Sequence, residues 1–255
     1  MKSPIKSSSG QTKSVSIIKE MIPQGSVIHS YGLFDAYLEL TLAEDQRFVI
    51  GHTPRAAIYD FWQCMKADPE RLYLMTKEQS THVSNERVLQ TLQKSWYTYA
   101  DPYLRSALFF LLNRCTQDGK ISAGHIDASG FNPLSLSRLR GFSSPNFHLS
   151  PTRAEESHLV PLPLETNDTD YLLYPIGKFR TSIMRSGAQG FEDFFVDHRM
   201  LSEHLITEKR KAVILLEYHP AAIKIYSKFK IVMIDSHGQV TVNKESCKEL
   251  IIANF

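Results

Sequence analysis

The chain has 255 residues, of which 42% are hydrophobic and 22% charged, and its formal net charge at pH 7 is +2. This composition is that of an ordinary globular protein, and the length suits one large domain, or a domain and a subdomain. Its three cysteines, Cys64, Cys115 and Cys247, are far apart, which excludes a disulfide framework and a C-x-x-C zinc site. The polar N-terminus and the lack of any apolar run near the ~18 residues of a membrane span predict a cytoplasmic protein without a membrane partner.

The first 115 residues predict two strands and several helices. A short helix over 12–23 precedes strands near Val27 and over 46–53. The next helix, over 53–70, has Thr53 in the N-cap position and Pro54 as its first helical residue. Apolar residues at helical spacing predict a helix over 85–99, and a stretch that is apolar nearly all round predicts a buried helix over 101–115.

The second half of the chain changes character twice. From 116 to 168 the pattern breaks up around five prolines, which predicts a loop-rich inserted subdomain. Strands at 170–174, 211–217, 230–234 and 249–255 then alternate with helices at 192–206 and 220–229. This alternation predicts one α/β domain, made of 1–115 and 169–255, with a mostly parallel sheet covered by helices on both faces.

Three local patterns resemble catalytic or metal motifs but fail on spacing. The segment "SSSGQTKS" at 7–14 lacks the glycine that directly precedes lysine in a phosphate loop. His198 and His204 are six residues apart rather than four, so we expect no metal site. His125 and Asp127 have no nucleophile turn to serve, so the chain is not expected to be a hydrolase.

Segments spread over the chain carry the strongest signal. The stretches at 107–132, 190–205, 223–234 and 248–255, and the opening "KSPIKSSSG…IIKEMIP", resemble Dam-type adenine-specific DNA methyltransferases in order and spacing. The resemblance covers almost the entire chain. It implies a methyltransferase-like, Rossmann-type sheet, a DNA-recognition role for 116–168, and the cytoplasm of a bacterial cell or a phage-infected host.

The resemblance also locates the reaction centre, which is missing. The family has a D-P-P-Y tetrapeptide after a strand, whose Asp and Pro accept hydrogen bonds from the target amine and whose Tyr stacks on the flipped base. An ungapped alignment places Pro175, Ile176, Gly177 and Lys178 there, and a one-residue gap places Tyr174 at the Asp position. Neither alignment supplies a carboxylate or a fourth-position aromatic ring.

The implied cofactor site is altered as well. The family has a glycine-rich F-x-G-x-G loop that lets S-adenosylmethionine approach the backbone. This chain keeps Gly32 but has Leu33, Phe34 and Asp35 at the following positions, and His52 takes the place of the acidic residue that would hold the ribose. An early Gly-Gly-Lys is reduced to "SGQ" at 9–11. We therefore expect no cofactor and no enzyme activity.

These losses predict a catalytically inactive methyltransferase-like protein that serves as a DNA-binding or protein-binding subunit or adaptor. Two alternatives stay open: an active adenine methyltransferase that uses Asp168, Asp170 or Glu192, and an interaction or inhibitor protein that no longer binds DNA.

Basic residues define the expected contact with double-stranded DNA. They are Arg114, Lys120, Arg138, Arg140, Lys178, Arg180 and Arg185. A protein partner from the transcription, replication or restriction machinery is also expected, with Phe191, Phe194 and Phe195 as a candidate docking patch.

Overall fold

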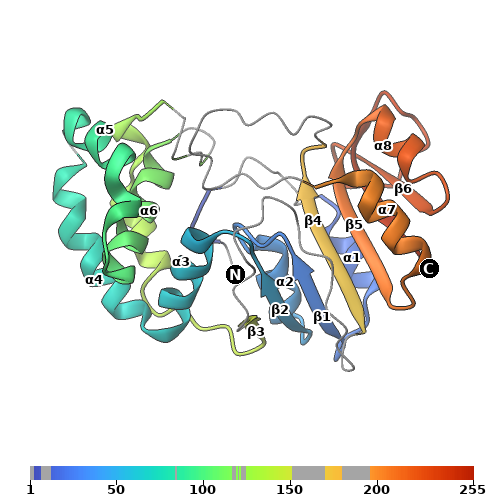
Figure 1. The fold of residues 1–255 in the computed structure, drawn as a ribbon, viewed down its shortest axis with the longest axis horizontal. Coiled ribbons are helices and arrows are strands. Elements are labelled where there is room, and N and C mark those ends of the chain that lie inside the picture. Colours follow the sequence, from blue (N-terminus) through green and yellow to red (C-terminus); the bar gives the residue numbers. More distant parts are fainter. Residues whose placement is uncertain are drawn as a thin grey trace. The chain divides into compact units, whose positions relative to one another are not determined.

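The computed structural model describes residues 3–6, 13–83, 85–116, 119, 121, 125–150, 170–179 and 196–255 (Figure 1). The chain forms two compact units. We call residues 9–54, 145–183 and 194–255 the sheet unit, and residues 1–8, 55–144 and 184–193 the helical unit. None of the described helices is long and apolar enough to cross a membrane.

The sheet unit contains one mixed sheet with the strand order β3-β2-β1-β4-β5-β7-β6. Strands β1 to β5 run parallel, and β7 is antiparallel to its neighbours β5 and β6. The order is that of a doubly wound sheet with β7 inserted before the last strand. The predicted α/β class with a mostly parallel, Rossmann-type sheet is therefore confirmed. The strands are β1 (Val27–Tyr31), β2 (Phe48–His52), β3 (Phe147–Leu149), β4 (Tyr171–Gly177), β5 (Lys211–Glu217), β6 (Lys230–Asp235) and β7 (Cys247–Ala253).

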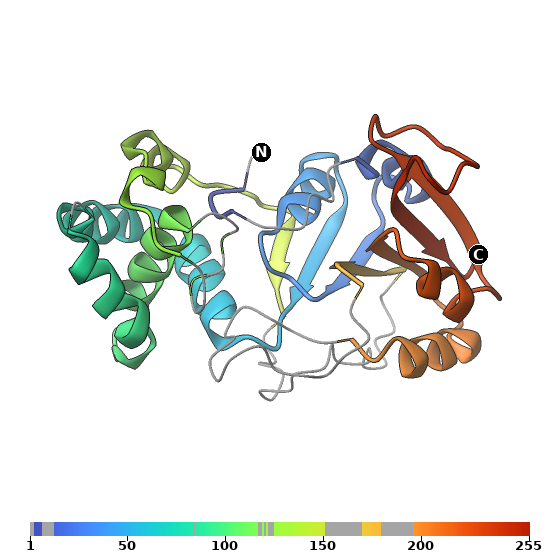
Figure 2. The same ribbon diagram turned by 90° about the horizontal axis from the view of Figure 1, so that it is seen from above.

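Helices cover both faces of this sheet, as Figure 2 shows. On one face lie α1 (Val15–Met21) and α2 (Tyr37–Glu44), and on the other lie α7 (His198–Thr207) and α8 (Pro220–Ile225). Successive strand residues point to opposite faces, so Leu172 and Tyr174 of β4 pack with Leu201 and Leu205 of α7.

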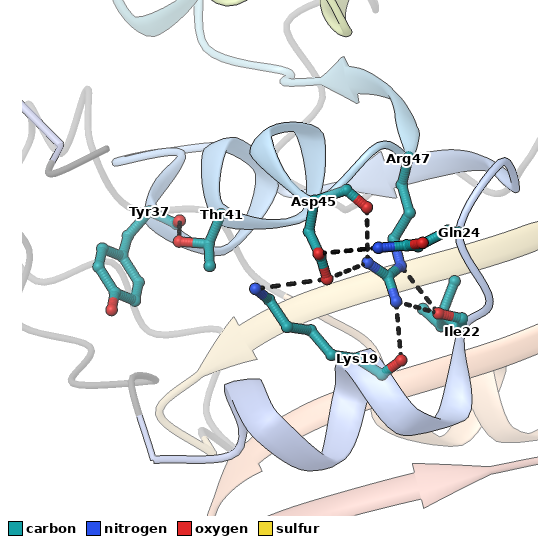
Figure 3. A network of polar contacts seen from close by, with 7 residues as sticks. All are labelled: Lys19, Ile22, Gln24, Tyr37, Thr41, Asp45 and Arg47. Carbon is teal, nitrogen blue, oxygen red and sulfur yellow. Dashed lines mark hydrogen bonds and ion pairs between the residues drawn. The ribbon is translucent and has the colours of Figure 1, made fainter.

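A buried arginine connects the end of α1 to the start of β2 (Figure 3). The Arg47 guanidinium donates to the backbone oxygens of Lys19 at 2.7 Å and Ile22 at 2.8 Å, and it pairs with Asp45. Asp45 in turn accepts from Gln24 at 3.1 Å. The carbonyls left open at the end of α1 are thus satisfied, which fixes β2 against the helix.

The helical unit packs around α6 (Pro102–Cys115), which is buried along most of its length. Around it lie α3 (Ala56–Ala67), α4 (Pro69–Gln79) and α5 (Glu86–Ser95). Phe61 of α3 contacts Phe109 and Phe110, with ring centroids 5.5 and 6.5 Å apart. Short 3-10 turns follow at η1 (Ser80–His82), η2 (Trp96–Thr98), η3 (Ala128–Gly130) and η4 (Pro133–Arg138).

Two predicted helix starts are wrong. Helix α3 begins at Ala56 after Arg55, with no side-chain cap, because residues 53–55 form the connection from the sheet unit to the helical unit. Helix α7 begins at His198, because the Asp197 carboxylate caps it by accepting the N–H groups of Arg199 and Met200, both at 3.0 Å. Residues 192–195, the expected start of that helix, lie outside the described residues.

The boundaries between the sheet unit and the helical unit differ from the boundaries predicted for the inserted subdomain. Residues 116–144 pack with the helical unit, where Trp62 contacts Phe142 at a centroid distance of 6.0 Å. Residues 147–149 instead form β3 beside β2. Residues 151–169 lie outside the described part of the chain, and the DNA-reading role of 116–168 stays a prediction.

Candidate functional site

The carboxyl ends of β1 and β2 are occupied by stacked side chains. In open α/β sheets this edge is where ligands bind, at the point where the strand order reverses. Here Tyr31 stacks on His52 with ring centroids 4.4 Å apart and planes 11° apart. The Nε2 atom of His52 lies 2.9 Å from Nδ1 of His29, so one imidazole donates to the other.

Both imidazoles in this pair are neutral at physiological pH. Burial, and to a smaller extent the neighbouring His29, lower the pKa of His52 to about 4. Burial lowers the pKa of His29 as well. The predicted ribose position therefore holds an uncharged ring already bonded to a protein group, rather than a free carboxylate.

The loop after β1 is filled by its own side chains. Gly32 keeps a positive φ of 100°, which glycine adopts readily. Leu33 is fully buried and lies against Gly51 of β2, where an added Cβ would be 2.8 Å from Leu33 Cδ2. The Asp35 carboxylate accepts the Tyr37 N–H at 3.0 Å, at the start of α2. At two of the family's glycine-loop positions, Leu33 thus packs in the core and Asp35 bonds to the first residue of α2.

The end of β4 differs from its prediction. The strand continues through Gly177 rather than stopping before Pro175, with a bulge between these two residues in its pairing with β5. The bulge accommodates Ile176 as an extra residue. Gly177 has a φ of 73°, so the chain turns there and leaves Lys178 exposed.

Tyr174 lies in the core instead of at the surface of the site. Its ring stacks on Tyr31 at 5.5 Å, and its hydroxyl has no hydrogen-bond partner among the described residues. Burial raises its pKa, so the hydroxyl stays protonated. Asp170, an acid considered as a replacement acceptor, accepts the Val27 N–H at 2.8 Å at the opposite end of β4. The other two acids, Asp168 and Glu192, lie outside the described residues.

The helical unit brings two of the predicted DNA-contacting residues together. The charge of Arg138 lowers the pKa of Arg114, although burial is the larger cause. Arg114 is half-buried, and its Nε atom has no hydrogen-bond partner among the residues described. Lys6 completes the group, since burial and then Arg114 lower its pKa. We call Lys6, Arg114 and Arg138 the cationic cluster.

Asn113 holds this cluster in place. It accepts the Lys6 N–H at 2.7 Å and donates to the Lys6 carbonyl at 2.9 Å. Lys6 Nζ then donates to the carbonyl of Arg114 at 2.7 Å. A Cβ at Gly119, whose φ is 73°, would lie 2.3 Å from the Lys6 carbonyl, so only glycine fits there. The Asp127 carboxylate contributes an opposing charge to Lys6.

The other predicted DNA-contacting residues are not in this cluster. Arg140 pairs with Glu70 at 3.3 Å and lies over the Tyr73 ring at 5.4 Å. Lys178 belongs to the sheet unit. Lys120, Arg180 and Arg185, and the candidate docking residues Phe191, Phe194 and Phe195, lie outside the described residues.

Sequence reasoning did not bring Lys6 and Asn113 together. The two are 107 positions apart, so neither spacing nor periodicity could pair them. The one usable signal was "NR" in the last turn of a strongly apolar helix, where a buried asparagine needs a specific partner.

The remaining cysteine and histidine candidates have structural roles in the described part of the chain. Cys64, Cys115 and Cys247 are buried free thiols. His198 Nδ1 lies 2.9 Å from the Tyr226 hydroxyl, and His204 pairs with Glu208 at 3.3 Å. No group of three or more His, Cys, Asp or Glu side chains suited to a metal ion occurs among the described residues.

The fold defines the chain as a Rossmann-type α/β protein with a separate helical unit. No family model matches the sequence, and no curated protein is significantly similar to it. Membership of the Dam-type family therefore stays a prediction from the sequence.

Proposed function

We propose that this chain is a methyltransferase-like protein that has lost methyl transfer and works as a DNA-binding subunit or adaptor. The observation that carries the proposal is the position of Leu33. Its side chain is fully buried against Gly51 at the place where a glycine loop would admit a cofactor. A bound S-adenosylmethionine would have to displace a core side chain, and emptying such a position costs about 2–5 kcal/mol.

The strand end at Tyr174–Lys178 supports the same proposal. Tyr174 is fully buried and carries a protonated hydroxyl, so it offers no carboxylate to accept a hydrogen bond from a target amine. The loss of a preorganised hydrogen bond of this kind costs about 10²–10³ in rate. Asp170 does not replace it, because that carboxylate is bonded to Val27 at the other end of the strand.

The cationic cluster supports binding of a phosphate backbone. Lys6, Arg114 and Arg138 are held close enough that the charge of one lowers the pKa of the next. Like charges in contact destabilise a fold, and a phosphate group would neutralise them. Arginine Nε is among the donors that bind phosphate, and Arg114 Nε has no partner in the described part of the chain.

An adaptor role follows from a retained scaffold without a reaction centre. In this proposal the chain binds DNA and a second protein supplies the output. We propose that this partner belongs to the transcription, replication or restriction machinery. Pull-down from the native cell should recover such a protein in stoichiometric amount.

Salt dependence of binding to a short duplex tests the DNA part of the proposal. Between about 50 and 200 mM salt, each neutralised phosphate adds roughly 0.9 to the slope of log affinity against log salt. Arg138→Ala is expected to lower this slope by about 0.9. The matched control is Arg87→Ala, an exposed arginine of α5 in the same unit, which should leave the slope unchanged. If Arg138→Ala has the same slope as the wild type, the cationic cluster is not part of the DNA interface. If the wild type does not bind the duplex, the proposed DNA role is wrong.

A further inference from the structure

Three aromatic rings stack just beyond the carboxyl ends of β4 and β5. Phe179 follows β4 by two residues, and its ring contacts those of His198 and His219. The centroid distances from Phe179 are 4.4 Å to His198 and 4.7 Å to His219, with interplanar angles of 29° and 19°. Since His198 and His219 make no ring contact with each other, they cover opposite faces of Phe179.

Hydrogen bonds fix both imidazoles of this ring stack. His198 Nδ1 lies 2.9 Å from the Tyr226 hydroxyl. His219 Nδ1 accepts the Ala221 N–H at 3.1 Å, as the N-cap of α8. This hydrogen bond fixes the orientation of the His219 ring. The rings are thus oriented before any ligand arrives, which lowers the entropy lost on binding.

The stack ends in a ring that is open to solvent. His198 is buried and Phe179 is partly buried, whereas His219 is exposed. No ring of another described residue covers the second face of His219. Lys178, the residue before Phe179, is also exposed and forms no ion pair with the residues that the structure describes. This is the edge at which open α/β sheets bind their ligands.

We propose that His219 is a stacking platform for an unpaired nucleobase of DNA, with Lys178 available to the adjoining phosphate. The proposal rests on the proposed DNA binding and adds a preference for distorted or single-stranded sites. Bases stack on aromatic side chains largely without regard to sequence, because every base has a π-face. The rings of Phe179 and His198 hold His219 in place, and His219 supplies the contact with the base.

The test uses a variant that removes the ring and keeps the helix cap. In His219→Asn the side-chain oxygen can still accept the Ala221 N–H, because asparagine is a favoured N-cap residue. The matched control is His237→Asn, an exposed histidine in the turn after β6. Equal thermal unfolding of the three proteins verifies that the fold is kept. Binding is measured to two duplexes of one sequence, one fully paired and one with a single unpaired adenine.

The wild type should prefer the duplex with the unpaired base. His219→Asn is expected to weaken binding to that duplex about 5- to 150-fold and to leave the paired duplex unchanged. Equal affinities of His219→Asn and wild type for the unpaired-base duplex, or an equal loss on both duplexes, would overturn the stacking proposal while duplex binding stands.

A titration with dAMP separates the two proposals if the wild type binds neither duplex. The proposed DNA function is then wrong. Binding of dAMP that His219→Asn weakens and His237→Asn does not would still support the stacking platform. If the wild type does not bind dAMP, or if all three proteins bind it equally, the stacking proposal is contradicted.

Discussion

Glu39 carries a carboxyl group that is enclosed between α2 and β1 in the sheet unit. Its Oε1 accepts a hydrogen bond from the Ser30 hydroxyl at 2.8 Å. Burial raises the pKa of Glu39 from 4.5 to about 7, because desolvation of the charged form outweighs that hydrogen bond. The pKa of Glu39 is higher in the folded state than in the unfolded state. The protonated carboxyl group therefore contributes its full share to the free energy of unfolding below pH 4.5, and this contribution is lost as the pH rises to about 7.

Glu39→Gln should remove this pH dependence, since glutamine is isosteric, neutral and still able to accept from Ser30. The variant should match the wild type near pH 4.5 and exceed it by about 3 kcal/mol in free energy of unfolding above pH 7. Urea unfolding across this range measures the effect. Glu203→Gln, on an exposed position of α7, is the control and should follow the wild type. A wild type and a Glu39→Gln variant with the same pH profile would show that Glu39 is not buried as described.

At the scale of elements, the side chain of Leu33 packs the loop after β1 against Gly51 of β2. A methyl group at Gly51 would lie 2.8 Å from Leu33 Cδ2 and 3.4 Å from Phe147 Cε2. Gly51→Ala should therefore destabilise the protein by about 1–3 kcal/mol through overpacking. In a Leu33→Ala background the same substitution should cost less, because the shortened side chain leaves room. A double-mutant cycle by urea unfolding measures this coupling, and strictly additive effects would contradict the filled loop.

The elements were largely predictable because their signals are local. A stretch that is apolar nearly all round predicted α6, and the alternation of strands and helices predicted the sheet class. The antiparallel direction of β7 was not predictable, since its buried residues, Leu250 to Ala253, have the same apolar pattern as a parallel strand. The start of α3 was missed because a favourable Thr-Pro pair lies in the connection between the units, where tertiary packing overrides capping preference.

The candidate site was predictable only where a family pattern located it. The sequence placed Leu33 and His52 at altered cofactor positions, but their packing on Gly51 and Tyr31 required the fold. The cationic cluster depends on the contact between Lys6 and Asn113, which joins distant parts of the chain. The ring stack of Phe179 with His198 and His219 likewise comes from three separate elements.

At the scale of the whole molecule, the two units carry different parts of the proposed function. The sheet unit contains the filled crevice at β1 and β2 and the ring stack beyond β4 and β5. The helical unit contains the cationic cluster. In the proposed function, loss of methyl transfer would concern the sheet unit alone and would leave the cationic cluster of the helical unit unchanged.

A filter-retention assay tests the central claim most directly, because it measures DNA binding and methyl transfer in one sample. The protein is mixed with fluorescent duplex DNA and S-adenosylmethionine that carries a radioactive methyl group, and both labels are counted on the filter and in the recovered DNA. The account predicts that the duplex is retained, that retention falls steeply with salt, and that no radioactivity is found on the protein or in the DNA. Methyl label in the recovered DNA, or a duplex that passes the filter at low salt, would contradict it.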